Sequence, residues 1–209
     1  MQDLKNLKCL LPETGKLLTA LIDTADFLNK YVLAGGSGLA LYLCHRKSED
    51  LDFFTYENFF EKETVFKYLK RFKHKEIINE TSEQLDILIN GVKVTFFNSA
   101  WDFLRPDNIN RFNLATLDNI TAMKVHTLFL RARYRDYYDL YYIAREKKSL
   151  RDIYDCSKDI IEGINFKVFA SALVYIDDIK DDNINHLAPA KQLSKQDIRS
   201  FFEKELLKL

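Results

Sequence analysis

Two alternating apolar stretches joined by Asn90-Gly91 constrain the fold of this 209-residue chain more than any other feature. Residues 84–89 and 92–97 have the pattern of strands, and Asn-Gly is the preferred two-residue type I′ turn between antiparallel strands. The turn fixes the register, so Asp86 is expected directly opposite Thr95. One face of the hairpin is then wholly apolar, whereas the other carries these two polar side chains. This asymmetry predicts a sheet with helices behind it and a working site in front.

Apolar residues recur at helical spacing on both sides of the hairpin, and residues 16–30 and 61–75 show that spacing before it. Five later stretches show it at 117–130, 136–148, 150–162, 167–177 and 194–207, with a polar connection at 177–189. The last stretch begins with Ser194-Lys195-Gln196-Asp197, which has the form of a capping box. The sequence predicts an α+β fold: a small mixed β-sheet domain flanked by helices at residues 1–113, then an α-helical domain at residues 114–209.

Charge and cysteine content exclude several classes of protein. The chain has 31 Lys and Arg and 31 Asp and Glu, so no global electrostatic attraction draws it toward nucleic acid. Cys9, Cys44 and Cys156 are odd in number and widely spaced. This pattern argues against a disulfide framework and against a zinc site, and it fits a reducing cytoplasm.

No segment has the pattern of a leader or a membrane span. Residues 1–5 carry acidic and basic side chains and no long apolar core, so they do not form a secretory signal. The longest uncharged run, residues 31–44, is interrupted by glycine and is shorter than the ~20 apolar residues that span a bilayer. We therefore expect a soluble, cytoplasmic protein without a membrane partner.

A small-residue turn, Gly35-Gly36-Ser37, separates the apolar run 31–34 from a helix-like stretch at 37–45. A turn of this kind at a helix start exposes backbone N–H groups, which bind phosphate well. By itself the tripeptide is more often an ordinary turn.

An Asp-x-Asp pair follows at the start of a predicted strand, residues 50–55. Side chains two apart on a strand point the same way, so Asp50 and Asp52 share one face. Two adjacent carboxylates repel unless a cation lies between them, and oxygen ligands suit Mg²⁺. The order strand, small-residue turn, helix, Asp-x-Asp strand is uncommon. It provides a phosphate cradle and a dicarboxylate metal site, as the transfer of a nucleotidyl or phosphoryl group requires.

These motifs together resemble the AbiEii/AbiGii toxin family of nucleotidyltransferases, within the polymerase-β-like nucleotidyltransferase superfamily. The matching runs are Ala34–Leu41, His45–Thr55, Asn90–Phe97, Met123–Val125, Arg131 and Arg135–Leu140. The resemblance covers nearly the whole chain. It implies a toxin of a type IV toxin–antitoxin or phage-exclusion system, and some members of the family add nucleotides to tRNA 3′ ends.

The resemblance also implies roles for individual residues. The nucleotide would be held by Gly35, Gly36 and Ser37, with Lys124, Arg131 and Arg135. The metal, Mg²⁺ or Mn²⁺, would be held by Asp50 and Asp52, and these two acids with Lys124 and Asp136 would be the catalytic residues.

Lys124 has apolar neighbours, so it projects from a mostly buried helix and needs a partner or a ligand phosphate. Arg131 and Arg135 follow it by seven and eleven residues, which places them on the same helical face if the helix is continuous. Asp136 would begin the next helix and position an attacking hydroxyl or anchor Lys124. The alternative interpretation is an ion-pair cluster in which both arginines face Asp136 and Asp139.

One position departs from the superfamily pattern. Many such enzymes carry a third carboxylate on the strand beside Asp-x-Asp, where this chain has Thr95. The hairpin register places Asp86 opposite Thr95, so we expect Asp86 to be the third acid or to lie just behind it. Without a third acid, the site would hold only one metal ion well or would use Asp136.

We therefore predict a metal-dependent nucleotidyltransferase that transfers NMP from an NTP to RNA, with tRNA as the expected acceptor and a separately encoded antitoxin as partner. The strongly basic stretch 62–75 favours a polyanionic acceptor, although such a stretch is usually a solvated helix face. Two alternatives remain open: transfer to a small hydroxyl compound, and a non-catalytic module of the same fold that binds a nucleotide or a partner.

Overall fold

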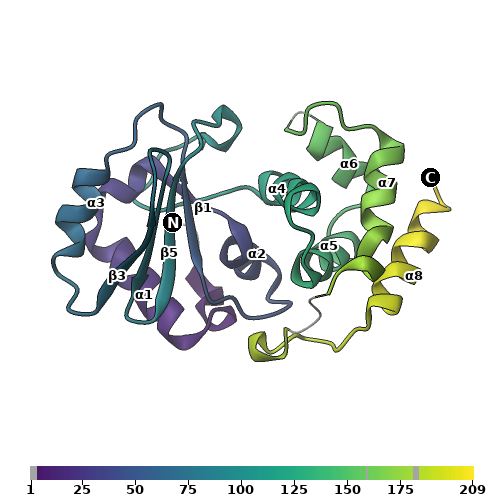
Figure 1. The fold of residues 1–209 in the computed structure, drawn as a ribbon, viewed down its shortest axis with the longest axis horizontal. Coiled ribbons are helices and arrows are strands. Elements are labelled where there is room, and N and C mark those ends of the chain that lie inside the picture. Colours follow the sequence, from purple (N-terminus) through teal and green to yellow (C-terminus); the bar gives the residue numbers. More distant parts are fainter. Residues whose placement is uncertain (1–3, 159, 181–183) are drawn as a thin grey trace. The chain divides into compact units, whose positions relative to one another are not determined.

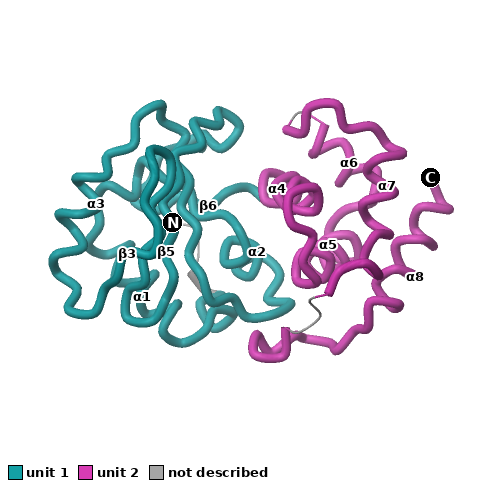
Figure 2. The backbone as a smooth tube through the Cα atoms, in the orientation of Figure 1, with its two compact units in different colours: residues 1–116 teal, residues 117–209 magenta. Residues whose placement is uncertain are grey.

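The computed structural model describes residues 4–158, 160–180 and 184–209. The chain divides into two compact units, unit 1 up to Thr116 and unit 2 from Leu117 onward (Figure 2). The boundary expected from the sequence, after residue 113, lies three residues before this division. Residues 1–3 of the N-terminal stretch and 181–183 of the expected polar connection lie outside the described residues.

Unit 1 is built on a mixed six-stranded sheet with the strand order β3-β4-β5-β2-β1-β6 (Figure 1). The strands are β1 Tyr31–Leu33, β2 Leu51–Thr55, β3 Lys75–Glu80, β4 Gln84–Ile89, β5 Val92–Asn98 and β6 Asn113–Leu114. The pairs β2/β5 and β1/β6 are parallel, and the other neighbours are antiparallel. Together with the helices of both units, this sheet confirms the predicted α+β fold.

The hairpin β4–β5 has the predicted register, with Asp86 opposite Thr95 and Ile89 opposite Val92. Asn90 and Gly91 both have positive φ, as a type I′ turn requires. The apolar face of the hairpin is at most 4% exposed. It belongs to the same core as apolar side chains of helices α1 (Pro12–Thr24) and α3 (Lys62–Leu69), so the predicted helices do lie behind the sheet.

The helices of unit 1 are α1 Pro12–Thr24, α2 Gly35–Leu43 and α3 Lys62–Leu69, with 3₁₀ turns at Leu4–Cys9, Asp26–Lys30 and Asp102–Leu104. The expected helix at 61–75 is too long, because α3 ends at Leu69 and Lys75 begins strand β3. The sequence did not predict β3, since all six of its residues are exposed and show no alternation of burial. Pairing with β4 is what makes this segment a strand.

Unit 2 is helical, with α4 Leu117–Leu130, α5 Tyr134–Glu146, α6 Leu150–Lys158, α7 Phe166–Val174 and α8 Lys195–Leu206. Its 3₁₀ turns are Tyr175–Asp178 and Asn185–Leu187. The fully buried rings of Tyr137, Tyr138, Phe169 and Phe202 form much of its interior. Buried tyrosine hydroxyls find partners here, since the hydroxyl of Tyr138 donates to the Lys191 carbonyl at 3.0 Å.

The predicted capping box of α8 is present. The Asp197 amide donates to Ser194 Oγ at 3.1 Å, and the Ser194 amide donates to Asp197 Oδ2 at 2.8 Å. No helix within the described ranges is long and apolar enough to cross a membrane.

The cysteine prediction was wrong at one point, because Cys9 and Cys44 form a disulfide. Cys9 ends the 3₁₀ turn Leu4–Cys9 and Cys44 caps the end of α2, and folding brings their Cα atoms to 5.1 Å. A separation of 35 residues gives no sign of this proximity in the sequence. Cys156 is free.

Candidate active site

The small-residue turn forms the first turn of α2, which begins at Gly35 directly after β1. Ala34 precedes the helix and has no side-chain oxygen to cap the first N–H groups of α2, which carry the positive end of the helix dipole. Ser37 is fully buried, and its hydroxyl donates to the backbone carbonyl of Asp50. This bond ties the turn to the residue at which the Asp-x-Asp motif begins.

Side chains pack closely against the first two positions of this turn. Gly35 has φ +62°, and a Cβ there would overlap the carboxylate of Asp52. A Cβ on Gly36 would lie 3.0 Å from Arg46 Nη2 and 3.1 Å from Ser48 Oγ. The structure therefore brings one acid of the Asp-x-Asp motif directly against the predicted phosphate-binding turn.

Asp52 is the second residue of β2, and Asp50 directly precedes the strand, which begins one residue later than predicted. Leu51 and Phe53 are buried on one face of the strand, whereas Asp52 is half-buried on the other. The loop before the strand is held by backbone contacts: the Leu11 amide donates to the Ser48 carbonyl at 2.9 Å. These contacts place Asp50 beside the N-terminal end of α1.

The same loop contains two polar residues that could contact phosphate and that are buried. Arg46 is 3% exposed and Ser48 is 5% exposed, although both belong to a short polar connection. The guanidinium of Arg46 donates to the Lys47 carbonyl at 2.9 Å and lies against Gly36. The burial of these residues depends on contacts between segments, so a single sequence carries little sign of it.

Asp86 lies close to Thr95 but is already surrounded by donors. Thr95 Oγ1 donates to Asp86 Oδ1 at 2.6 Å, and Gln84 Nε2 donates to Oδ2 at 2.8 Å. Burial alone would raise the pKa of Asp86, but these hydrogen bonds and the charge of Lys93 hold that pKa below its usual value. Thr95 in turn pairs with Asp52 across the β2/β5 ladder, so Thr95 links Asp86 to the Asp-x-Asp strand.

Within the described ranges, no three His, Cys, Asp or Glu side chains gather as a metal site, so Asp86 does not join Asp50 and Asp52 in one cluster. The two acids of the Asp-x-Asp motif nevertheless fit Mg²⁺. This ion commonly binds one or two carboxylates and completes its shell with water and substrate phosphates. Asp52 lies against the predicted phosphate-binding turn, where substrate phosphates would complete that combination of ligands.

A second cluster of charged side chains is buried inside unit 2. Lys124 Nζ of α4 lies 3.0 Å from Asp136 Oδ1 and 2.6 Å from Asp139 Oδ2, both on α5. Both acids are 0% exposed, and the Lys124 side chain is 6% exposed. The predicted pairing of Lys124 with Asp136 is thus a direct ion pair, and Asp139 belongs to the same cluster.

Two cations keep Asp136 ionised. Burial alone would raise the pKa of Asp136, but the charges of Lys124 and Arg131 hold that pKa below its usual value. Arg131 Nη2 lies 3.3 Å from Asp136 Oδ1. The other oxygen, Oδ2, is buried and has no hydrogen-bond partner within the described part of the chain.

The expected basic stripe on one continuous helix is not formed. Helix α4 ends at Leu130, Ala132 has a positive φ of 44°, and α5 begins at Tyr134. Arg131 therefore lies in the connection, and Arg135 lies on the second helix. The reversal at Ala132 directs Arg131 toward Asp136, which forms part of the ion-pair cluster considered as the alternative.

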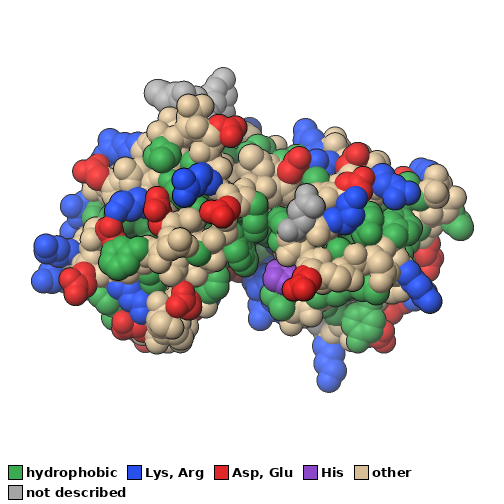
Figure 3. Space-filling model, turned by 90° about the horizontal axis from the view of Figure 1, so that it is seen from above, with side chains coloured by type: hydrophobic (Ala, Val, Ile, Leu, Met, Phe, Trp, Pro, Cys, Tyr) green, Lys and Arg blue, Asp and Glu red, His purple; other side chains and the backbone are tan. Residues whose placement is uncertain are grey.

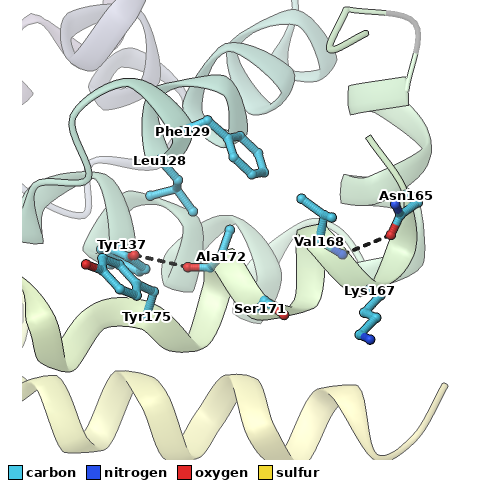
Figure 4. A pocket seen from close by; sticks show the side chains of 9 residues that line it. All are labelled: Leu128, Phe129, Tyr137, Asn165, Lys167, Val168, Ser171, Ala172 and Tyr175. Carbon is cyan, nitrogen blue, oxygen red and sulfur yellow. Dashed lines mark hydrogen bonds between the residues drawn. The ribbon is translucent and has the colours of Figure 1, made fainter. Parts of the chain in front are cut away.

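Unit 2 also has an open pocket of about 620 Å³ between the end of α4 and α7 (Figure 4). Its lining is mostly apolar and includes Leu128, Phe129, Val168 and Tyr175. None of the predicted site residues lines it. The pocket is therefore separate from the charged cluster around Lys124.

A mixed sheet in which a helix N-terminus meets an Asp-x-Asp strand defines a nucleotidyltransferase class of protein. The chain matches the family model described as "Nucleotidyl transferase AbiEii toxin, Type IV TA system" over residues 16–99 and 92–207. It belongs to this family, and is a nucleotidyltransferase toxin of the type IV toxin–antitoxin class. Membership implies an NTP substrate and an antitoxin, and enzymes of this kind are typically metal-dependent.

The chain is also similar to individual proteins of other organisms. An uncharacterized protein of Aquifex aeolicus (strain VF5) is 25% identical over 184 residues, which cover 84% of this chain and 89% of the relative. The crystal structure of a candidate nucleotidyltransferase from H. pylori matches with a TM-score of 0.54 and 22% identity, over 94% of this chain and 95% of the other. The nucleotidyltransferase toxin MenT4 from Mycobacterium tuberculosis H37Rv matches with a TM-score of 0.60 and 16% identity, over 94% of this chain and 85% of MenT4. The two solved structures show that the fold is shared.

Proposed function

We propose that this protein transfers NMP from an NTP to an RNA acceptor, with tRNA as the expected substrate and Mg²⁺ or Mn²⁺ as the cofactor. The observation that supports this most strongly is the packing of the Asp52 carboxylate against Gly35. This packing places the Asp52 carboxylate, a proposed metal ligand, beside the N–H groups at the start of α2, where the charge of a triphosphate would be neutralised.

In unit 1, the backbone N–H groups of Gly35, Gly36 and Ser37 bind the phosphates, and Asp50 and Asp52 hold the metal. The bound metal would neutralise phosphate charge and polarise the reacting phosphoryl group. Asp86 acts as a positioning residue, because it fixes Thr95 beside Asp52 through the bond at 2.6 Å.

In unit 2, Lys124 stabilises the charge that develops on the phosphoryl group, as a positioned cation does in this chemistry. Asp136 holds Lys124 through Oδ1 and would help to activate the acceptor hydroxyl. Arg131 and Arg135 add positive charge for the polyphosphate. Asp139 shares Lys124 and fixes its orientation.

A local basic surface favours RNA over a small acceptor. Lys67, Lys70 and Lys73 are exposed on and just after α3, and Figure 3 shows basic side chains gathered at the left, at the end of unit 1 where α3 lies. Phosphate contacts of this kind would make RNA binding weaken as salt rises. Because NTP and tRNA are available there, we propose the cytoplasm as the site of action, with a separately encoded antitoxin.

A labelling assay tests the proposal. The protein is incubated with Mg²⁺, total tRNA and each α-³²P NTP in turn, beside the Asp50→Ala/Asp52→Ala variant. We expect label in RNA with at least one NTP and only with the intact acids. Loss of label after chelation of the metal, with recovery on adding Mg²⁺ or Mn²⁺, identifies the cofactor.

Two results would contradict the RNA acceptor. Label that enters small hydroxyl compounds but never RNA would establish the alternative acceptor. Nucleotide binding without transfer to any acceptor would indicate a non-catalytic module, which the absence of a third acid at Thr95 also allows.

A further inference from the structure

The sheet face that carries Asp52 also carries aromatic side chains. Phe54 lies two residues beyond Asp52 on β2, so both side chains point to the same face. The register of β2 and β5 places Thr95 beside Asp52 and Phe97 beside Phe54. The aromatic residues therefore continue the face on which we place the metal and the phosphates.

Three of the rings form a nearly parallel stack. The centroids of Phe54 and Trp101 are 5.9 Å apart with an interplanar angle of 14°, and those of Trp101 and Phe103 are 5.3 Å apart with an angle of 22°. Phe97 meets Phe54 edge-on at 5.6 Å. We call Phe54, Phe97, Trp101 and Phe103 the aromatic platform.

The platform differs from the aromatic core on the opposite face of the sheet. There Phe53 and Phe96 are 1% exposed, whereas every ring of the platform is only half-buried. The segment that carries Trp101 is held in place, because Ser99 Oγ donates to the Thr55 carbonyl at 2.8 Å and Leu104 is buried. The platform is thus a fixed stack of rings with Trp101 in the middle, and it keeps contact with solvent.

We propose that the aromatic platform is a nucleobase-stacking subsite, an inference that rests on the proposed nucleotidyl transfer. Two residues along a strand span about 6.7 Å, a distance that one ribose can bridge between a phosphate near Asp52 and a base on Phe54. Nucleobases stack on aromatic side chains without strong sequence preference. The base belongs either to the NTP or to the end of the RNA acceptor.

Trp101 makes a direct test possible, since it is the one tryptophan in the sequence. Its ring lies inside the stack, so a base that docks on an end ring, Phe54 or Phe103, would change its environment and quench its fluorescence. We would titrate the protein, in Mg²⁺, with each NTP, with inorganic triphosphate and with a short single-stranded RNA. We expect quenching by the NTP or by the RNA, and none by triphosphate, although triphosphate competes with the NTP. The ligand that quenches identifies the source of the base.

Variants separate stacking from a purely structural role. Trp101→Ala removes the middle ring that supports both end rings, so it should weaken binding of the quenching ligand about tenfold and leave triphosphate affinity unchanged. Calorimetry measures these affinities, because the variant has no tryptophan. Trp101→Phe keeps a ring and should retain most of the affinity. Phe59→Ala is the matched control, because Phe59 is 71% exposed in the same unit and lies outside the platform. Thermal unfolding reports whether each variant is folded. If Trp101→Ala is not folded, Phe54→Leu is used in its place.

The outcomes distinguish this proposal from the proposed function. Transfer that persists with unchanged affinities in Trp101→Ala, without quenching in the wild type, would overturn the subsite and leave the transferase intact. A wild-type protein that binds neither NTP nor triphosphate would overturn the proposed function and the subsite with it. Quenching by triphosphate as strong as that by NTP would show a conformational response rather than stacking, and would also overturn the subsite.

Discussion

At the scale of single residues, Gly35 and Asp52 depend on each other. Gly35 adopts a left-handed backbone, and the Asp52 carboxylate occupies the space that a Cβ would need. A glycine here is therefore a condition for placing the acid beside the phosphate-binding turn. Gly91 offers a comparison, because its φ is also positive, at 83°, and nothing lies within 4 Å of a Cβ built there.

We expect Gly91→Ala to lower the free energy of unfolding by about 1–2 kcal/mol, the cost of a left-handed alanine. Gly35→Ala should lower it by more, because its Cβ would also overlap the Asp52 carboxylate. Only Gly35→Ala should also displace Asp52, so it should reduce nucleotidyl transfer by about tenfold or more. Urea denaturation and the labelling assay measure the two effects. Equal activity in the two variants would show that the contact with Asp52 is not needed for catalysis.

The buried cluster around Lys124 links stability to pH. Asp136 has a pKa below its ordinary value of 3.8 in the folded protein, with Lys124 the main cause of the lowering. An acid of this kind stabilises the fold above its unfolded-state pKa, and that stabilisation is lost as pH falls below about 4.

Lys124→Met should destabilise the protein by about 3–5 kcal/mol at neutral pH, because it leaves Asp136 and Asp139 buried without their cation. Burial would then raise the Asp136 pKa, so the stability of the variant should fall as pH rises through that pKa. The difference in unfolding free energy from wild type should grow between pH 3 and pH 6 when measured by urea denaturation. Lys158→Met, at an exposed pair with Asp155, is the control and should cost about 1 kcal/mol or less. A difference independent of pH would refute this account of Asp136.

At the scale of elements, local signals were sufficient where a helix or turn is stabilised by its own residues. The capping box of α8 formed as predicted from four residues, and the type I′ turn set the register of six residue pairs between β4 and β5. Elements stabilised by distant partners were predicted less well. Strand β3 was missed, whereas the break between the helical stretches predicted at 117–130 and 136–148 is present as the reversal at Ala132.

Ser194→Ala removes the side chain that caps α8 and leaves the Asp197 amide without its acceptor. We expect a loss of about 1 kcal/mol in the free energy of unfolding with no change in nucleotidyl transfer. Ser194→Asp keeps an acceptor at the cap and should retain most of the stability. Chemical denaturation followed by helical circular dichroism is the measurement. A loss as large in Ser194→Asp as in Ser194→Ala would contradict the capping role.

At the scale of the whole molecule, the residues proposed for catalysis come from both units. Unit 1 carries the turn and the Asp-x-Asp motif, whereas unit 2 carries Lys124 and Asp136. Membership of a toxin family predicts that the chain inhibits growth when it is produced without its antitoxin.

Induced expression of the wild-type chain in a bacterial host should therefore arrest growth. Asp50→Ala should abolish the arrest at an equal protein level, because it removes a metal ligand and leaves the core untouched. Phe59→Ala should remain toxic. Colony counts after induction, with the protein quantified by immunoblot, test this expectation. Equal toxicity of Asp50→Ala would separate growth inhibition from nucleotidyl transfer.

The sequence by itself determined the features that depend on residues close together in the chain. Turn chemistry at Asn90-Gly91, alternation along β2 and the order of the small-residue turn and Asp-x-Asp are all read over a few positions, and together they indicated the family. The roles of the individual site residues stay predictions until the variants are measured.

Only the tertiary structure decided which distant residues meet. It placed Arg46 against Gly36, joined Cys9 to Cys44, surrounded Asp86 with donors and enclosed Lys124 between two acids. It also placed the half-buried aromatic platform on the face that carries Asp52. The physical reason is that strand pairing and helix packing bring together residues whose separation in the sequence carries no periodic signal, and such contacts exist only once the core has formed.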